Sequence, residues 1–215
     1  MRIHTACCLC LIIAATLAPP ASRAQYNTDA RNISQKDVLE ALQFMGLDIF
    51  KFGVDTARGC DLFVVMDEFG EKGAPLGSDT LLRCESSFER RIYDSVRTEV
   101  PVDSLRFLTK LDTRTYAWVS LDVSTPGVAS WKEVSIRPPY NRKHYWVRFA
   151  HSSSQIGKKQ PLLFLGSEWD DVVAGVKTTR FCSRLEMNPD LSDPTVKFMP
   201  HFYVISYVLQ PRQAQ

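Results

Sequence analysis

The chain has 215 residues, with 26 basic and 24 acidic side chains and 45% hydrophobic residues, which is the composition of a folded protein and excludes a disordered one. Without residues 1–24, whose charged side chains are Arg2 and Arg23, the balance becomes 24 basic against 24 acidic. A neutral chain argues against nucleic acid as the main partner, because that binding depends on an excess of Lys and Arg.

Residues 1–24 have the features of a signal peptide. Arg2 supplies the positive charge, positions 6–18 form an apolar run interrupted by one Thr, and Ser22-Arg23-Ala24 places small residues at a cleavage site. The run is shorter than the ~20 residues that span a bilayer. We expect cleavage before Gln25 and a protein that is secreted or periplasmic and not membrane-spanning; the alternative is a buried N-terminal helix. We treat residues 25–215 as a single domain.

A helix is predicted near the start of this domain. Ser34 followed by Asp37 resembles a capping box, and Gly46 provides a helix end. Between them lies an apolar stripe at helical spacing, formed by Val38, Leu39, Leu42 and Met45. This pattern predicts an amphipathic helix that packs on the rest of the domain.

The rest of the chain has mostly β-strand patterns separated by turns. Strands are expected at 47–54, 62–66, 80–84, 116–123, 131–136, 143–150, 162–165, 179–187 and 202–209. Residues 87–97 are ambiguous, and their four-residue apolar spacing favours a short second helix. The sequence therefore predicts a mainly β fold, either an antiparallel β-sandwich or a jelly-roll-like barrel, with the N-terminal helix added to it.

Cys60 and Cys84 lie symmetrically about Lys72, the centre of a predicted hairpin loop. An antiparallel register centred there places them side by side, so a Cys60–Cys84 disulfide is expected in an oxidising compartment. Cys182 remains unpaired in this interpretation. The alternative is a buried free thiol at each of the three positions.

Sequence motifs that indicate metal binding or catalysis are weak. His144, His151 and His201 lack the spacing of metal ligands, so no metal and no cofactor is expected. The segment Gly166-Ser167 lacks the second glycine of a nucleophile elbow, and no catalytic residue is assigned. One enzymatic alternative is kept: an exported hydrolase whose site is built from loop residues. Its carboxylates and histidines would be His144, His151, Glu168, Asp170 and Asp171.

The strongest candidate for a functional site is aromatic. We expect a ligand-binding face formed by Tyr116, Trp118, Trp131, Trp146 and Arg148, because aromatic rings with polar neighbours suit sugars and protein interfaces. The alternative is that these tryptophans are buried in the core. The favoured function is a non-catalytic binding module for a glycan or an extracytoplasmic protein. A structural subunit that pairs through the uncharged strand 202–209 is a further alternative.

Overall fold

The computed structural model describes residues 34–54, 59–93, 96–151 and 154–212, and the predicted leader lies outside these ranges. The first element is helix α2 (Gln35–Phe44). The predicted capping box is confirmed: the Ser34 N–H donates to Asp37 Oδ2 at 2.7 Å, and the Asp37 N–H donates to Ser34 Oγ at 3.2 Å. The expected packing of the apolar stripe is wrong, because no residue of α2 is buried and the Leu39 side chain is 42% exposed.

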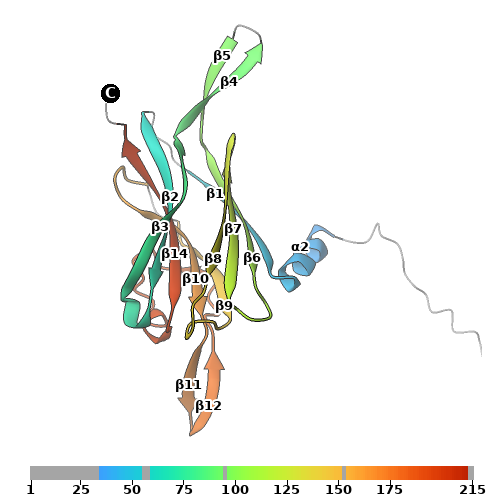
Figure 1. Ribbon diagram of the computed structural model, residues 1–215, viewed down its shortest axis with the longest axis vertical. Helices are drawn as coiled ribbons and strands as arrows, with labels where there is room; N and C mark the ends of the chain where they lie inside the picture. The colour runs from blue at the N-terminus through green and yellow to red at the C-terminus, as the bar shows by residue number, and fades with distance from the viewer. Residues whose placement is uncertain (1–33, 55–58, 94–95, 152–153, 213–215) are drawn as a thin grey trace, which may run out of the picture. The chain divides into compact units, whose positions relative to one another are not determined.

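The remaining described residues are mainly β-strands, and the predicted antiparallel β-sandwich is confirmed. The first sheet has the order β1-β6-β7-β8, with every neighbouring pair antiparallel (Figure 1). Its strands are β1 (Leu47–Gly53), β6 (Ser104–Leu111), β7 (Trp118–Thr125) and β8 (Val128–Ser135). We call it sheet A.

The second sheet, sheet B, has the order β13-β9-β10-β14-β2-β3 and is antiparallel except for the β13–β9 pair. Its strands are β2 (Cys60–Phe69), β3 (Pro75–Glu85), β9 (His144–Phe149), β10 (Gln160–Ser167), β13 (Glu186–Met187) and β14 (Phe202–Pro211). Strand β14 lies between β10 and β2, in the middle of the sheet. The alternative of a subunit that pairs through residues 202–209 is therefore wrong, because this strand has no free edge.

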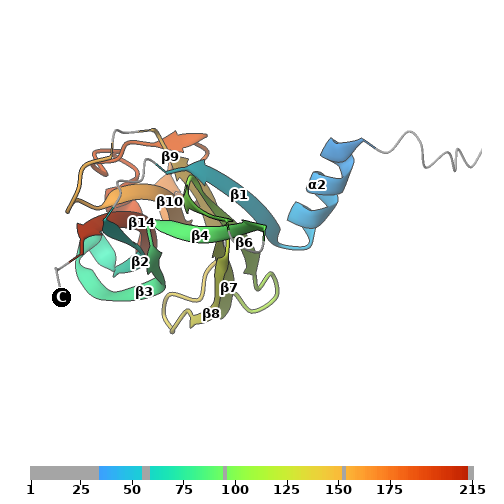
Figure 2. The ribbon, with the colours of Figure 1, turned by 90° about the horizontal axis from the view of Figure 1, so that it is seen from above.

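The main core lies between the two sheets, which face each other in Figure 2. Strand alternation fills it from both sides: Leu105, Phe107 and Leu121 come from sheet A, and Leu163 and Ile205 come from sheet B, all fully buried. This arrangement leaves the opposite face of each sheet to be covered or solvated.

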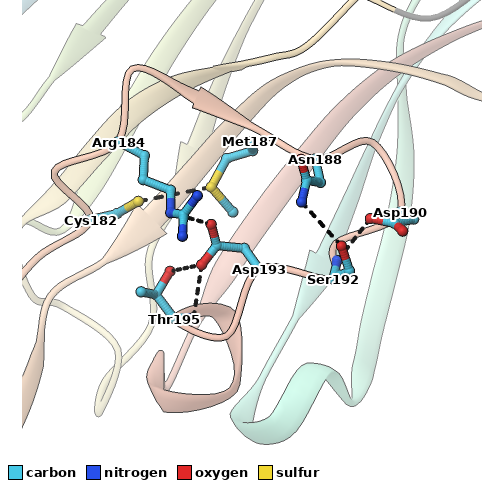
Figure 3. Close-up of polar contacts among 8 residues, drawn as sticks. All are labelled: Cys182, Arg184, Met187, Asn188, Asp190, Ser192, Asp193 and Thr195. Atoms are coloured by element: carbon cyan, nitrogen blue, oxygen red, sulfur yellow. Dashed lines mark hydrogen bonds and ion pairs between the residues drawn. The ribbon is translucent and has the colours of Figure 1, made fainter.

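The outer face of sheet B is covered by residues 181–201. Met187 and Met199 of this segment pack with Phe164 and Phe202 in a second buried cluster. Asp193, also buried, fixes the segment by pairing with Arg184 and by accepting hydrogen bonds from the Thr195 N–H and hydroxyl at 2.9 and 2.7 Å (Figure 3). Sheet A has no comparable cover among the described residues, and its outer face is the solvated one.

Two hairpins extend the sandwich, and Figure 1 shows them projecting from opposite ends. One is β4 (Ser87–Tyr93) with β5 (Val96–Pro101), and the other is β11 (Trp169–Val173) with β12 (Val176–Arg180). The predicted helix at 87–97 is therefore wrong. Cross-strand pairing decides this segment, including a 3.0 Å ion pair between Glu89 and Arg97. The 3-10 turns η2 (Glu71–Gly73) and η3 (Val196–Phe198) complete the elements.

The expected Cys60–Cys84 pairing does not form. Near its tip the β2–β3 hairpin has the predicted register, with Phe69 opposite Pro75. Two β-bulges then each add a residue on β3, at Leu76 and Leu81, so Cys84 lies opposite Leu62. Cys60, Cys84 and Cys182 are free thiols in this structure.

Candidate functional site

The candidate site is the outer face of sheet A, which is defined by the side-chain alternation of its strands. Val119, Leu121 and Val123 of β7 point into the core, so Trp118, Ser120, Asp122 and Ser124 point outward. The register extends this face across the sheet in rows. One row joins Ile49, Leu108, Asp122 and Trp131, and the next joins Leu47, Lys110, Ser120 and Glu133.

Trp131 forms a flat apolar surface on this face. The side chain is 65% exposed, yet its Nε1–H donates a 2.7 Å hydrogen bond to Ser120 Oγ on β7. This bond holds the indole across the neighbouring strand and leaves the ring available for stacking. Asp122 lies directly opposite on β7, and its Oδ1 is buried without a hydrogen-bond partner among the described residues. This unpaired acceptor therefore lies below the surface, directly opposite the exposed ring.

A pocket of about 350 Å³ opens at the Trp118 end of the face. Tyr116 and Trp118 supply aromatic surface, and Arg142 and Lys143 supply positive charge. Lys110 Nζ also lies 5.9 Å from the Trp118 ring centroid, a cation–π contact. The pocket therefore combines aromatic walls with polar groups, as small-ligand sites do.

The loop that carries Tyr116 is held by Asp112. Tyr116 has a φ of 53°, in the left-handed region that costs free energy for a non-glycine residue. Asp112 accepts hydrogen bonds from the N–H groups of Arg114 and Ala117 and from the Thr115 hydroxyl. These bonds, with that of Thr115 the largest cause, lower the pKa of Asp112 to about 2. Both carboxylate oxygens of Asp112 are thus committed to its own loop.

Two residues predicted for the aromatic face lie elsewhere. Trp146 packs from sheet B against the main core, with its ring centroid 6.0 Å from that of Phe50. The Arg148 guanidinium lies over Phe50 and Phe52 at 5.4 and 5.6 Å from their centroids. The structure therefore brings Tyr116, Trp118 and Trp131 to one side of sheet A and places Trp146 and Arg148 beside β1.

The residues of the hydrolase alternative do not converge into one cleft. Asp170 is paired with Arg142 at 3.1 Å and with Lys177 at 3.3 Å, and Asp171 is paired with Arg180 at 2.7 Å. His151 lies in a separate cavity of about 70 Å³ with Phe52 and Tyr207. The contact of Glu168 with this region is made by its backbone, whose N–H donates to the Lys143 carbonyl.

A polar chain that sequence reasoning missed is buried at the same end of the sandwich. His201 Nε2 lies 3.0 Å from Glu68 Oε1, and His201 Nδ1 lies 3.3 Å from His144 Nε2. His144 Nδ1 lies 2.7 Å from the Arg142 carbonyl oxygen, and the Tyr140 ring stacks on His201 at 4.5 Å. The three side chains come from β2, β9 and the residue before β14, so no local motif connects them.

These hydrogen bonds leave His144 without a free ring nitrogen for catalysis, although His144 lines the pocket. Its Nδ1–H is needed by the Arg142 carbonyl, and its Nε2 faces His201. Burial lowers the pKa of His144 to about 4 and also lowers the pKa of His201, against the opposing effect of Glu68. The His144 ring is therefore neutral at pH 7, and it offers no free nitrogen to a ligand in the pocket.

No His, Cys, Asp and Glu side chains within the described ranges cluster in threes as metal ligands. In the same ranges, no helix has both the length and the apolar character that crossing a bilayer requires.

The fold and the site define a two-sheet antiparallel β-sandwich with one covered sheet and one solvated, aromatic sheet face. The chain belongs to a family described as a domain of unknown function (DUF5041), whose pattern matches residues 19–211. No curated protein and no solved structure matches the chain.

Proposed function

We propose that this protein is an exported, non-catalytic binding module whose sheet A outer face binds a glycan. The observation that carries the proposal is the Trp131 indole, which is exposed and is held by its hydrogen bond to Ser120. A fixed aromatic ring offers stacking area at low entropic cost, which is what the apolar face of a pyranose requires.

The polar groups around the ring support a sugar in preference to a purely apolar partner. The exposed Glu133 carboxylate and the Ser120 hydroxyl lie in the row next to that of Trp131. Such oxygens accept hydrogen bonds from sugar hydroxyls. Along β7 the face runs from Ser124 to Trp118, about 20 Å at ~3.3 Å per residue, which is long enough for an oligosaccharide.

The pocket geometry favours binding over chemistry. Asp112 is occupied by its own loop, Arg142 is paired with Asp170, and His144 has both ring nitrogens engaged. General acid–base catalysis needs a titratable group within hydrogen-bond reach of substrate, and these groups are committed to the protein.

Export is part of the proposal and rests on residues 1–24. The charge, the apolar run and the small residues before Gln25 agree with a cleaved leader. N-terminal sequencing of protein from the extracytoplasmic fraction should begin at Gln25. A product that retains Met1 would contradict export by cleavage.

Affinity gel electrophoresis tests the binding function. The mature protein is run through native gels that contain dextran, mannan, arabinoxylan or polygalacturonate, beside the variants Trp131→Ala and Phe198→Ala. Phe198 is a matched control, because it is an exposed aromatic residue (55%) of the segment that covers sheet B. We expect at least one polymer to retard wild type and Phe198→Ala but not Trp131→Ala. If no polymer retards the wild type, the glycan proposal is wrong and a protein partner becomes the better interpretation of the face.

A further inference from the structure

Two basic side chains lie directly opposite each other on the outer face of sheet A, at the end away from Trp118. Lys51 on β1 is the register partner of Arg106 on β6, and Arg106 in turn pairs with Ser124 on β7. Like charges directly opposite in an antiparallel sheet are destabilising. Neither cation forms an ion pair with any residue that the structure describes; Arg106 Nε donates only to the Ser124 hydroxyl, at 3.2 Å.

These two cations line a groove of about 540 Å³ beside the β7–β8 turn. Ser104, Ser124 and Thr125 also line the groove. The Ser104 hydroxyl donates to Asp103 Oδ1 at 2.9 Å, and Ser124 Oγ accepts the bond from Arg106. The groove thus presents two positive charges, and its lining residues include no carboxylate. This combination suits an anionic oxygen group, for which a guanidinium offers a two-pronged donor and an ammonium a point charge.

The groove is continuous with the aromatic face. Ser124 and Asp122 are alternate residues of β7, so the row that contains Trp131 lies about 7 Å from the row of Lys51 and Arg106. A glycan that stacks on Trp131 would therefore reach the groove with its neighbouring sugar unit. At the opposite end of the face, Lys143 lines the other pocket.

We propose that the Lys51–Arg106 groove is a subsite for an anionic substituent of the glycan, so that the ligand is an acidic polysaccharide. The inference rests on the proposed glycan binding and adds the chemical class of the ligand. The shared chemistry is a negatively charged oxygen group, which is a carboxylate in a uronic acid or a sulfate ester in a sulfated sugar. The net charge of the chain does not provide this attraction, since the mature chain is expected to be neutral.

Paired polymers that differ only in charge test the subsite. Isothermal titration calorimetry measures the affinity of the protein for each polymer at two salt concentrations. Polygalacturonate is compared with its methyl ester, and dextran sulfate is compared with dextran. The variants are Lys51→Gln, Arg106→Gln and the double variant, with the exposed Lys158→Gln as a charge-matched control and Trp131→Ala as the stacking variant. The glutamines keep the polar stem and remove the charge, and circular dichroism verifies folding.

We expect wild type and Lys158→Gln to bind one charged polymer more tightly than its neutral partner, and each single variant to weaken this binding roughly tenfold. The double variant should bind both members of the pair equally and with less salt dependence. The charged polymer that is bound distinguishes carboxylate from sulfate. If the double variant retains the preference for charge, or if wild type prefers the neutral polymer, the subsite is wrong while glycan binding stands. If wild type binds none of the four polymers and Trp131→Ala changes nothing, the proposed function itself fails.

Discussion

Ser120 on β7 accepts a 2.7 Å hydrogen bond from the Trp131 indole on β8, and this contact fixes an exposed aromatic ring across two strands. Ser120→Ala should weaken glycan binding a few-fold, because a net hydrogen bond of about 1 kcal/mol no longer holds the ring in place. Unfolding free energy should change little, since the site is solvated. Titration calorimetry and thermal unfolding check the two effects. A Ser120→Ala variant with unchanged affinity would show that this bond does not prepare the ring for stacking.

Asp112 supports the pocket end of the face in a different way. Asp112→Ala removes the hydrogen bonds that stabilise the loop with Tyr116 in its left-handed conformation, so the ligand should lose the Tyr116 contact. We expect roughly tenfold weaker binding and a destabilisation of ~1–2 kcal/mol in denaturant unfolding. Because the pKa of Asp112 is about 2, the wild-type loop should keep its structure down to pH 4. Equal affinity in Asp112→Ala and wild type would remove the loop from the site.

The buried histidine chain predicts acid sensitivity. An unfolded imidazole binds a proton below pH 6.5, whereas burial holds the folded pKa of His144 at about 4. The unfolded state therefore binds more protons between these values, and stability falls as the pH drops from 6.5 to 4. For His144 this loss amounts to ~3 kcal/mol, and His201, whose pKa is also lowered, adds to it.

His144→Gln tests this directly, because it removes the titrating ring and keeps polar atoms near the Arg142 carbonyl. Urea unfolding at several pH values should give a shallower dependence for the variant than for wild type between pH 4 and 6.5. His151→Gln is the control, since His151 lies outside the chain that Glu68, His201 and His144 form. Identical pH profiles for His144→Gln and wild type would contradict a neutral buried ring.

The thiols give a prediction about covalent structure. Because the bulges place Cys84 opposite Leu62, N-ethylmaleimide in denaturant without reductant should label the peptides that contain Cys60, Cys84 and Cys182. In the folded protein Cys84 should react slowly, since burial raises the pKa of its thiol. Peptide mass spectrometry reads both results, and a Cys60–Cys84 linked peptide pair would refute this register.

Much of the sandwich could be predicted because period-two alternation is a local signal. The inward set Val119, Leu121 and Val123 was readable from β7 itself, and the turn at 126–127 was marked by Pro and Gly. The hairpin register failed for a physical reason: a bulge is an insertion of one residue whose position depends on packing, and two bulges in β3 moved Cys84 by two places.

The site was partly predictable for a related reason. Alternation placed Trp118 on the outward side of β7, but it could not say which sheet face is covered by another segment. The strand that contains Trp146 has the same alternating pattern, yet Trp146 packs against the main core because its strand belongs to the other sheet. The Glu68–His201–His144 chain joins residues from three distant segments, and only the strand order brings them together.

We propose that the outer face of sheet A binds a glycan through Trp131. The most direct test is isothermal titration calorimetry of wild type, Trp131→Ala and Phe198→Ala with the polymer that retards the wild-type protein most strongly in affinity gels. We expect Trp131→Ala to lose about 2 kcal/mol or more of binding free energy with an unchanged melting temperature, while Phe198→Ala binds like wild type. Wild-type affinity in Trp131→Ala would show that the outer face of sheet A does not bind the glycan through Trp131.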